Sequence, residues 1–180
     1  MQRFILTGAP GAGKTAILRR LEHLGHAVVE EAATDVIALA TAEGRSAPHL
    51  SPDFIDDIVA LQRRRQARAD QAGGEVVIYD RSPICTWALA AFLGRPPGEA
   101  LRREARRIRR DGVYERRAFF IRNQGFVTPT DARRISFEES LRFERVHAAV
   151  YRRFGFDCVP VEPGPLEARA AIIEAALALP

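Results

Sequence analysis

Residues 8–15 of this 180-residue chain read Gly8-Ala9-Pro10-Gly11-Ala12-Gly13-Lys14-Thr15. The apolar residues 4–7 precede this stretch, and Ile17, Leu18 and Leu21 follow it at helical spacing. The eight residues fit the pattern G-x-x-x-x-G-K-[ST] without a mismatch, between a predicted strand and a predicted helix. Glycines let successive backbone N–H groups point at phosphate oxygens, and the helix adds the positive end of its dipole. This stretch therefore predicts a phosphate-binding loop, or P-loop.

The polar side chains of the P-loop each receive a predicted role. We expect Lys14 to reach the β- and γ-phosphates of a nucleoside triphosphate, and the Thr15 hydroxyl to ligate Mg²⁺. Lys14 is the only lysine of the chain, and it stands where a compact ammonium is required, because the planar fork of arginine would not serve there. The predicted cofactors are ATP and Mg²⁺. The predicted nucleotide-binding residues are Gly8, Ala9, Pro10, Gly11, Ala12, Gly13, Lys14, Thr15 and Ala16.

Short apolar segments alternate with helical patterns along the rest of the chain. Strands are predicted at residues 4–7, 26–30, 76–79, 118–121 and 158–161. Helices are predicted at residues 15–21, 33–42, 84–93, 100–110, 137–154 and 166–179, with one more that starts at Ser51 or Asp53. This alternation is typical of an α/β fold with a five-stranded parallel sheet covered by helices on both faces. The length favours a single domain over residues 1–180.

Charged residues follow two of the predicted strands, at the edge of the sheet where ligands of such folds bind. Asp80 ends a buried strand, so we expect it either to hold the magnesium ion or to act as the base; a helix cap is the structural alternative. Arg81 offers a bidentate fork to an anionic group, and a salt bridge within the fold is its alternative. Glu31 at the end of the second strand is a candidate base for an acceptor hydroxyl or amine, whereas Glu30 is expected to point the other way.

The polar segment 124–136 lies between the fourth predicted strand and the long helix after it. Its core, residues 128–134, is rich in turn-forming residues and ends in two arginines. We interpret it as a lid that closes over the nucleotide and brings Arg133 or Arg134 to the γ-phosphate. A solvated basic loop is the alternative.

Other features of the composition favour ordinary structural roles. No run approaches the ~20 apolar residues of a membrane span, and the start of the chain is too short for a leader, so we expect a cytoplasmic protein. Cys85 and Cys158 match no zinc-ligand spacing, and the pair His23 and His26 lacks companion ligands. Trp87 beside Cys85 is a candidate for the acceptor pocket or, by default, for the core.

Arginine supplies nearly all of the basic charge, and the helix predicted at residues 100–110 carries six arginines. Because aromatic residues for base stacking are absent among them, a solvated helix face is favoured over a nucleic-acid site. The predicted partners are therefore a nucleoside triphosphate and a small-molecule acceptor. The sequence leaves a homodimer open.

With these residues identified, the chain resembles the NadR-like AAA-domain family of P-loop proteins related to nucleoside and nucleotide kinases. The resemblance rests on the P-loop, on residues 28–33, on Asp80-Arg81-Ser82-Pro83, on Asp131-Ala132-Arg133 and on Val159-Pro160-Val161. It implies a kinase-like core with a lid. It also implies that Asp80 and Arg81 correspond to the Asp-Arg pair of thymidylate-kinase-like enzymes, that Arg133 is a lid arginine, and that the loop after Val161 lies on the adenine side. The adenylyltransferase portion of the fused members is not found in this chain.

The favoured hypothesis is a Mg²⁺-dependent phosphotransferase that acts on a nucleoside, nucleotide or other small hydroxyl compound. The predicted catalytic residues are Lys14, Asp80, Arg81, Arg133 and Glu31. The predicted metal ligands are Thr15 and Asp80. The alternative is a P-loop ATPase or switch with a protein or nucleic-acid partner. A classical GTPase is disfavoured because its base-reading motif needs a second lysine, and an oligomeric AAA+ motor because the chain ends before a helical lid domain. A kinase predicts a closed acceptor pocket beside Glu31 and Arg81; a switch predicts an exposed apolar patch.

Overall fold

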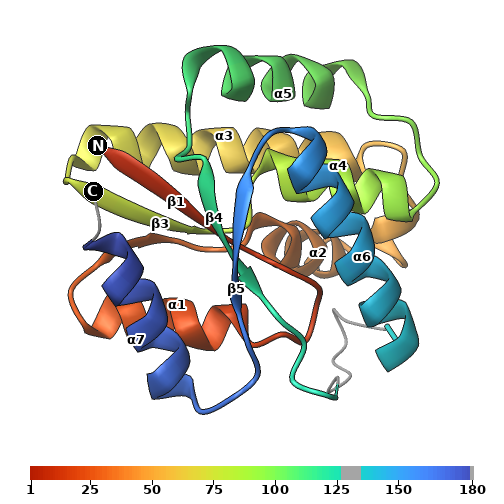
Figure 1. The fold of residues 1–180 in the computed structure, drawn as a ribbon. Helices are drawn as coiled ribbons and strands as arrows, with labels where there is room; N and C mark the ends of the chain where they lie inside the picture. Colours follow the sequence, from red (N-terminus) through yellow and green to blue (C-terminus); the bar gives the residue numbers. More distant parts are fainter. Residues whose placement is uncertain (127–134, 179–180) are drawn as a thin grey trace.

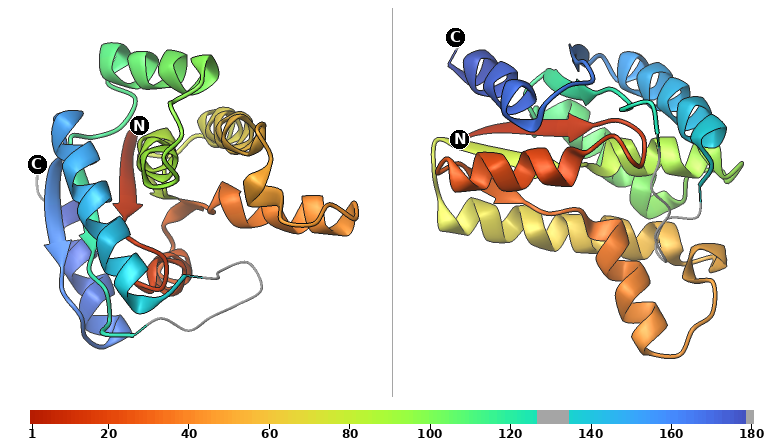
Figure 2. Two further views of the ribbon diagram at one scale, coloured as in Figure 1. Left: turned by 90° about the vertical axis from the view of Figure 1, so that its right-hand side faces the viewer. Right: turned by 90° about the horizontal axis from the view of Figure 1, so that it is seen from below.

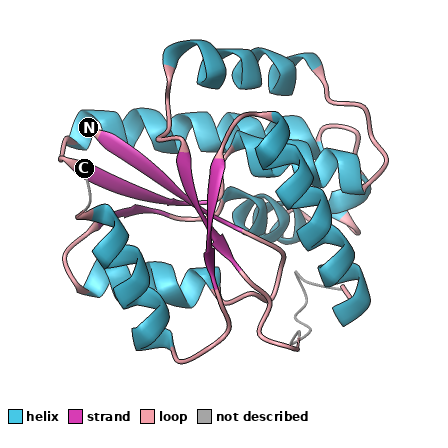
Figure 3. Ribbon diagram, viewed as in Figure 1, coloured by secondary structure: helices cyan, strands magenta, loops and turns pink. Residues whose placement is uncertain are grey.

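The computed structural model describes residues 1–126 and 135–178 and contains one five-stranded parallel sheet (Figures 1 and 3). Its strands are β1 (Gln2–Thr7), β2 (Ala27–Val29), β3 (Val76–Asp80), β4 (Arg117–Ile121) and β5 (Asp157–Val161), in the spatial order β2-β3-β1-β4-β5. All pairings are parallel, and Leu6 of β1 lies opposite Asp80 of β3. The carboxyl ends of the strands therefore meet at one edge, and the predicted fold class is confirmed.

Helices cover both faces of the sheet. They are α1 (Lys14–His23), α2 (Ala32–Ala42), α3 (Phe54–Ala72), α4 (Pro83–Phe92), α5 (Glu99–Asp111), α6 (Phe137–Arg153) and α7 (Leu166–Leu177), with a short 3-10 helix η1 (Pro48–Leu50). One face packs on α1 and α7 through a buried cluster that contains Phe4, Leu18 and Ile173. The other face packs on α4, α5 and α6 through a cluster that contains Ile5 and Tyr151. Aliphatic strands buried on both sides explain this three-layer arrangement.

Helix α2 projects away from the two helical layers, together with the chain that leads into α3 (Figure 2). It returns to the body through α3, where Phe54, Ile55 and Ile58 form a third buried cluster with Ala32 and Leu101. None of the helices in the described part of the chain is both long and apolar enough to cross a bilayer.

The second strand is shorter than predicted. It ends at Val29, so Glu30 and Glu31 lie in the turn before α2, and Glu31 takes the N-cap position of that helix. The prediction that Glu31 ends a strand is therefore wrong by two residues, although Glu31 still lies at the carboxyl edge of the sheet. Likewise Ser82, rather than Asp80, caps α4: the Ser82 hydroxyl accepts the N–H of Ile84 at 3.2 Å.

Candidate functional site

The P-loop joins β1 to α1 at the centre of the carboxyl edge of the sheet. Three of its glycines have positive φ: 127° at Gly8, 83° at Gly11 and 85° at Gly13. At Gly8 the space is also closed, because a Cβ would lie 2.3 Å from the carbonyl oxygen of Ile121. Only glycine satisfies both conditions, and the loop can therefore curl tightly against the end of β4.

Lys14 is buried inside this curl, with 5% of its surface exposed. Its Nζ donates to the carbonyl oxygen of Ala9 at 2.8 Å, across the loop. Burial lowers the pKa of Lys14 to about 8, with the nearby Arg81 charge acting in the same direction and the Asp80 and Glu31 carboxylates opposing it. An ammonium this poorly compensated favours an anion placed inside the loop.

Helix α6 fixes the P-loop from the other side. The Ser140 hydroxyl, which is fully buried, donates to the carbonyl oxygen of Pro10 at 2.9 Å and accepts from Asn123 Nδ2 at 3.0 Å. Asn123 follows β4, and its backbone N–H donates to the Glu144 carboxylate at 3.0 Å. The predicted lid segment begins just after this network, so α6 connects the P-loop to the chain that flanks that segment.

Thr15 and Asp80 lie together where α1 begins. The Thr15 hydroxyl donates to Asp80 Oδ2 at 3.0 Å, while the buried Oδ1 of Asp80 has no hydrogen-bond partner among the described residues. Burial raises the pKa of Asp80, Lys14 opposes this, and the nearby Glu31 carboxylate adds to it. A hydroxyl beside a carboxylate with an unpartnered oxygen is the donor set that Mg²⁺ prefers. These two residues fit the predicted metal site.

Arg81 crosses the site on a strained backbone, with φ of 74°. Its Nε donates to the Glu31 carboxylate, and its Nη1 donates to the carbonyl oxygen of Gly8 at 3.1 Å. Burial, the largest single influence, would lower the pKa of Arg81 and raise that of Glu31, but the surrounding charges and hydrogen bonds together reverse both shifts. The pKa of Arg81 is raised, with Glu31 as the main opposing charge, and that of Glu31 is lowered, with Arg81 and then Lys14 as the main opposing charges. The pair is therefore ionised, and it links the P-loop to the start of α2.

Two residues that the sequence analysis did not single out hold this ion pair in place. His147 of α6 is fully buried; its Nδ1 lies 3.0 Å from the carbonyl oxygen of Phe143 and its Nε2 lies 3.4 Å from Arg81 Nη1. Burial and then the Arg81 charge lower the pKa of His147 well below its usual value, so the neutral ring donates to Phe143 and accepts from Arg81. On α3, Arg65 donates to the carbonyl oxygens of Glu30 and Glu31, at 2.9 and 2.6 Å.

A cavity of about 240 Å³ opens beside Glu31 and Arg81, between α2, α3, α4 and α6. Its walls are mostly apolar, with contributions from Ile37, Phe54, Ile58, Leu89, Leu93 and Phe143. Gln62 and Thr86 form a polar part of this wall, where the Thr86 hydroxyl donates to the side-chain carbonyl of Gln62 at 3.0 Å. The cavity lies on the β2 and β3 side of the P-loop, where the sequence analysis expected an acceptor pocket.

The remaining predicted residues divide between the site and the body of the protein. Cys85 lines the cavity and is a free thiol, whereas Trp87 packs on Phe154 with ring centroids 5.1 Å apart. Ala16 is exposed at the start of α1. Arg133 and Arg134, with the rest of segment 127–134, lie outside the described residues.

The arginine-rich helix α5 forms one wall of a groove of about 1000 Å³, and α3 forms the other. Acidic side chains neutralise much of its charge: Arg106 pairs with Glu99 at 2.7 Å, and Arg107 with Glu104 at 2.6 Å. The interpretation of α5 as a solvated helix face stays a prediction.

A family model described as an AAA domain matches residues 3–169. Three solved structures share the fold at low sequence identity. The NadR protein in complex with NAD and AMP-PNP is 19% identical, with a TM-score of 0.70, and the match covers 97% of this chain and 48% of that one. Deoxyadenosine kinase from M. mycoides with products bound is 14% identical, with a TM-score of 0.61 and 98% of both chains covered. Thymidylate kinase from Ehrlichia chaffeensis is 14% identical, with a TM-score of 0.64 and 98% of both chains covered.

The chain thus spans about half the length of the NadR chain that it matches. A comparison with curated proteins found no match.

Proposed function

The chain belongs to the AAA-domain family whose model spans residues 3–169, and on that premise we propose that it is a magnesium-dependent phosphotransferase. In this proposal the γ-phosphoryl group of ATP passes to the hydroxyl group of a small acceptor. One observation carries it: the partly buried ion pair of Arg81 and Glu31 lies between the P-loop and a cavity whose walls are mainly apolar. Such cavities are typical of small-molecule sites, whereas a switch protein needs an exposed surface for its partner.

The proposed reaction assigns one task to each charged group. Lys14 binds the β- and γ-phosphates inside the P-loop, and Thr15 with Asp80 holds Mg²⁺, which neutralises charge on the phosphate oxygens. Glu31 accepts the proton of the acceptor hydroxyl, whose oxygen forms a bond to the γ-phosphorus as the bond to the β-phosphate oxygen breaks and ADP leaves. Arg81 stabilises the negative charge on the phosphoryl group during its transfer.

Glu31 is the better candidate for the base. Its side chain is 19% exposed and lines the cavity, and its lowered pKa keeps it ionised at neutral pH. Asp80 is 3% exposed and bonded to Thr15, which suits a metal ligand better than a base that must reach an acceptor. Arg133 remains our proposed lid residue on the basis of the sequence.

The cavity favours a neutral acceptor over a phosphorylated one. Its described basic residues are Arg81, which already bonds Glu31 and Gly8, and His49. A phosphate group placed here would face the Glu31 carboxylate, with which the Arg81 guanidinium is already paired. In the polar part of the wall, the side-chain carbonyl of Gln62 accepts a hydrogen bond from Thr86. The side-chain N–H groups of Gln62 can therefore donate to a ligand.

We therefore propose a nucleoside-like acceptor, with a hydroxyl beside Glu31 and a carbonyl or ring nitrogen beside Gln62. The similar folds of a NadR protein with bound NAD and AMP-PNP and of a deoxyadenosine kinase support a search among nucleosides first.

The test is acceptor-dependent release of ADP from ATP and Mg²⁺, with ribonucleosides, deoxyribonucleosides, their monophosphates and simple alcohols as acceptors. We expect at least one neutral nucleoside to stimulate release and to appear as a monophosphate. Glu31→Gln should lower kcat by about 100-fold or more. Glu30→Gln is the matched control, because Glu30 is exposed and pairs with Arg19. Slow ATP hydrolysis that ignores every acceptor would reject the proposal in favour of an ATPase or switch.

A further inference from the structure

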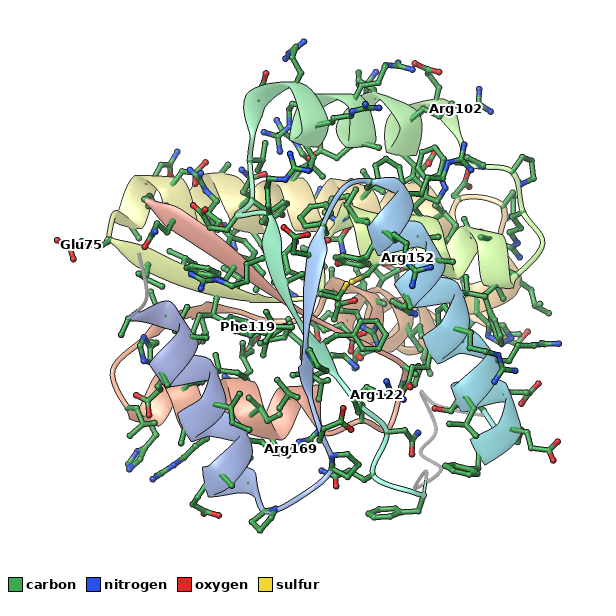
Figure 4. All side chains as sticks on the ribbon, in the orientation of Figure 1. Glu75, Arg102, Phe119, Arg122, Arg152 and Arg169 are labelled. Carbon is green, nitrogen blue, oxygen red and sulfur yellow. The ribbon has the colours of Figure 1, made fainter. Side chains whose placement is uncertain are left out.

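Arg169 of α7 is a buried arginine at the back of the P-loop. Its side chain is 2% exposed. Its Nη2 donates to the backbone carbonyl of Arg122 at 3.0 Å, and its Nη1 lies 3.1 Å from where a Cβ on Gly13 would stand. Figure 4 shows Arg169 and Arg122 beside each other at the end of the sheet from which α7 begins. The guanidinium therefore touches the turn into α1 and the loop after β4 at once.

The contacts of Arg169 within the described residues leave its charge without a counter-charge. No carboxylate in residues 1–126 and 135–178 forms an ion pair with Arg169, and its buried Nε has no hydrogen-bond partner there. Burial lowers the pKa of Arg169, and no neighbouring charge counteracts it. Ala170 and Ile173 bury the apolar face of helix α7 against the sheet, so the docking of α7 does not depend on the Arg169 side chain alone. A buried, uncompensated guanidinium is a cost that a stable fold normally avoids.

The order of the strands indicates which part of a bound nucleotide would lie near Arg169. The cavity proposed for the acceptor lies on the β2 and β3 side of the P-loop. A triphosphate held in the P-loop must then extend its nucleoside portion toward the other side, where the loops after β4 and β5 lie. Gln124 connects these two loops, since its carbonyl accepts the N–H of Gly164 at 3.3 Å. Arg169 stands at the junction of the P-loop with this second side.

We propose that Arg169 is a positioning residue for the donor nucleoside triphosphate. Its bond to Arg122 holds the loop after β4 against the P-loop, and its charge is balanced by the phosphates once the donor is bound. The free protein then carries an electrostatic cost that nucleotide binding relieves. This inference rests on the donor half of the proposed function and needs neither the acceptor nor the phosphoryl transfer.

The experiment compares Arg169→Met and Arg169→Lys with Arg152→Met, which removes the same charge from an exposed position on α6. The measurements are the Tm of each free protein and its calorimetric affinity for AMP-PNP with Mg²⁺, at a temperature where all are folded. We expect Arg169→Met to keep or raise the Tm of the free protein and to weaken AMP-PNP binding by about tenfold or more. Arg169→Lys, which keeps the charge, should recover part of the lost affinity, and Arg152→Met should bind like the wild type.

A loss of affinity smaller than tenfold in folded Arg169→Met overturns the inference, whatever happens to its Tm. If Arg169→Met does not fold, Arg169→Lys provides the test. Because lysine lacks the guanidinium group that reaches both loops, Arg169→Lys must bind AMP-PNP more weakly than Arg152→Met does. Wild-type protein that binds AMP-PNP but phosphorylates no acceptor would reject the proposed transferase while leaving this inference standing. Wild-type protein that does not bind AMP-PNP rejects both.

Discussion

The titration of Lys14 offers a direct test of the P-loop electrostatics. Burial lowers the pKa of its ammonium from 10.5 to about 8 in the nucleotide-free protein. At 1.36 kcal/mol per pH unit, holding the charge in the free loop costs about 3 kcal/mol. The unfolded chain binds more protons than the folded protein between pH 8 and 10.5, so the free energy of unfolding should rise with pH across this window. Below pH 8 both states are protonated and the cost is fully present.

A bound triphosphate should reverse this shift, because its negative charge stabilises the ammonium. At pH 8.5 about a quarter of Lys14 is protonated in the free protein, so binding should take up about three-quarters of a proton. Since Lys14 is the only lysine, protein grown with ¹³Cε-labelled lysine gives a single side-chain resonance whose shift follows this one group. We expect its midpoint near pH 8 in the free protein and above about pH 10 with AMP-PNP and Mg²⁺ bound.

The same labelled protein in denaturant supplies the unfolded reference, and calorimetry in buffers of different ionisation enthalpy supplies an independent proton count. A midpoint near 10.5 in the free protein would refute the description of Lys14 as a buried, poorly compensated charge. A lowered midpoint that AMP-PNP leaves unchanged would show that the phosphates do not reach Lys14.

Three further predictions concern single positions. Gly8→Ala should destabilise the protein by more than about 3 kcal/mol in urea unfolding, because its Cβ meets a backbone carbonyl; Gly25→Ala, at φ 96° with nothing within 4 Å, should cost only about 1–2 kcal/mol. Thr15→Val should weaken Mg²⁺-dependent nucleotide binding by about tenfold or more yet leave Mg²⁺-free binding within about twofold, and equal losses would argue against a metal ligand. Gln62→Leu should raise the acceptor KM by about tenfold while the KM for ATP stays constant, and a rise in both would place Gln62 outside the acceptor site. The partner Thr86 provides a second variant, Thr86→Val, which should have a smaller effect of the same kind.

The sequence predicted the fold and the centre of the site because both depend on local signals. The P-loop pattern occupies eight consecutive residues, and each buried strand is a short apolar run that can be recognised without its neighbours. The convergence of Asp80, Arg81 and Glu31 followed from one rule, that parallel strands end at the same edge. The structure brings these three residues together with Lys14 as that rule requires.

The details that failed depend on contacts between distant segments. Strand β2 pairs with β3 through three residues only, and the backbone of Glu31 is instead fixed by Arg65, 34 positions later. His147 reaches Arg81 across 66 positions from the buried face of α6, on which Phe143, Val150 and Tyr151 alternate with polar residues. A histidine or arginine on such a face gives no sign in the sequence of the group it will contact. Arg169 was missed for the same reason.

Several polar groups of the described site already hold internal hydrogen bonds in the absence of a ligand, and this has a chemical consequence. Lys14 donates to a loop carbonyl, Thr15 donates to Asp80, and Arg81 is committed to Glu31 and Gly8. Entry of a magnesium nucleotide must therefore exchange internal bonds for ligand bonds, and only the stronger charge-assisted contacts to phosphate make that exchange favourable. Two charges remain without adequate partners in the described residues, Lys14 and Arg169, and Arg169 lies beside Gly13, the residue that precedes Lys14. A polyanion bound in the loop would compensate both positive charges, which neither a neutral ligand nor a metal ion alone can do.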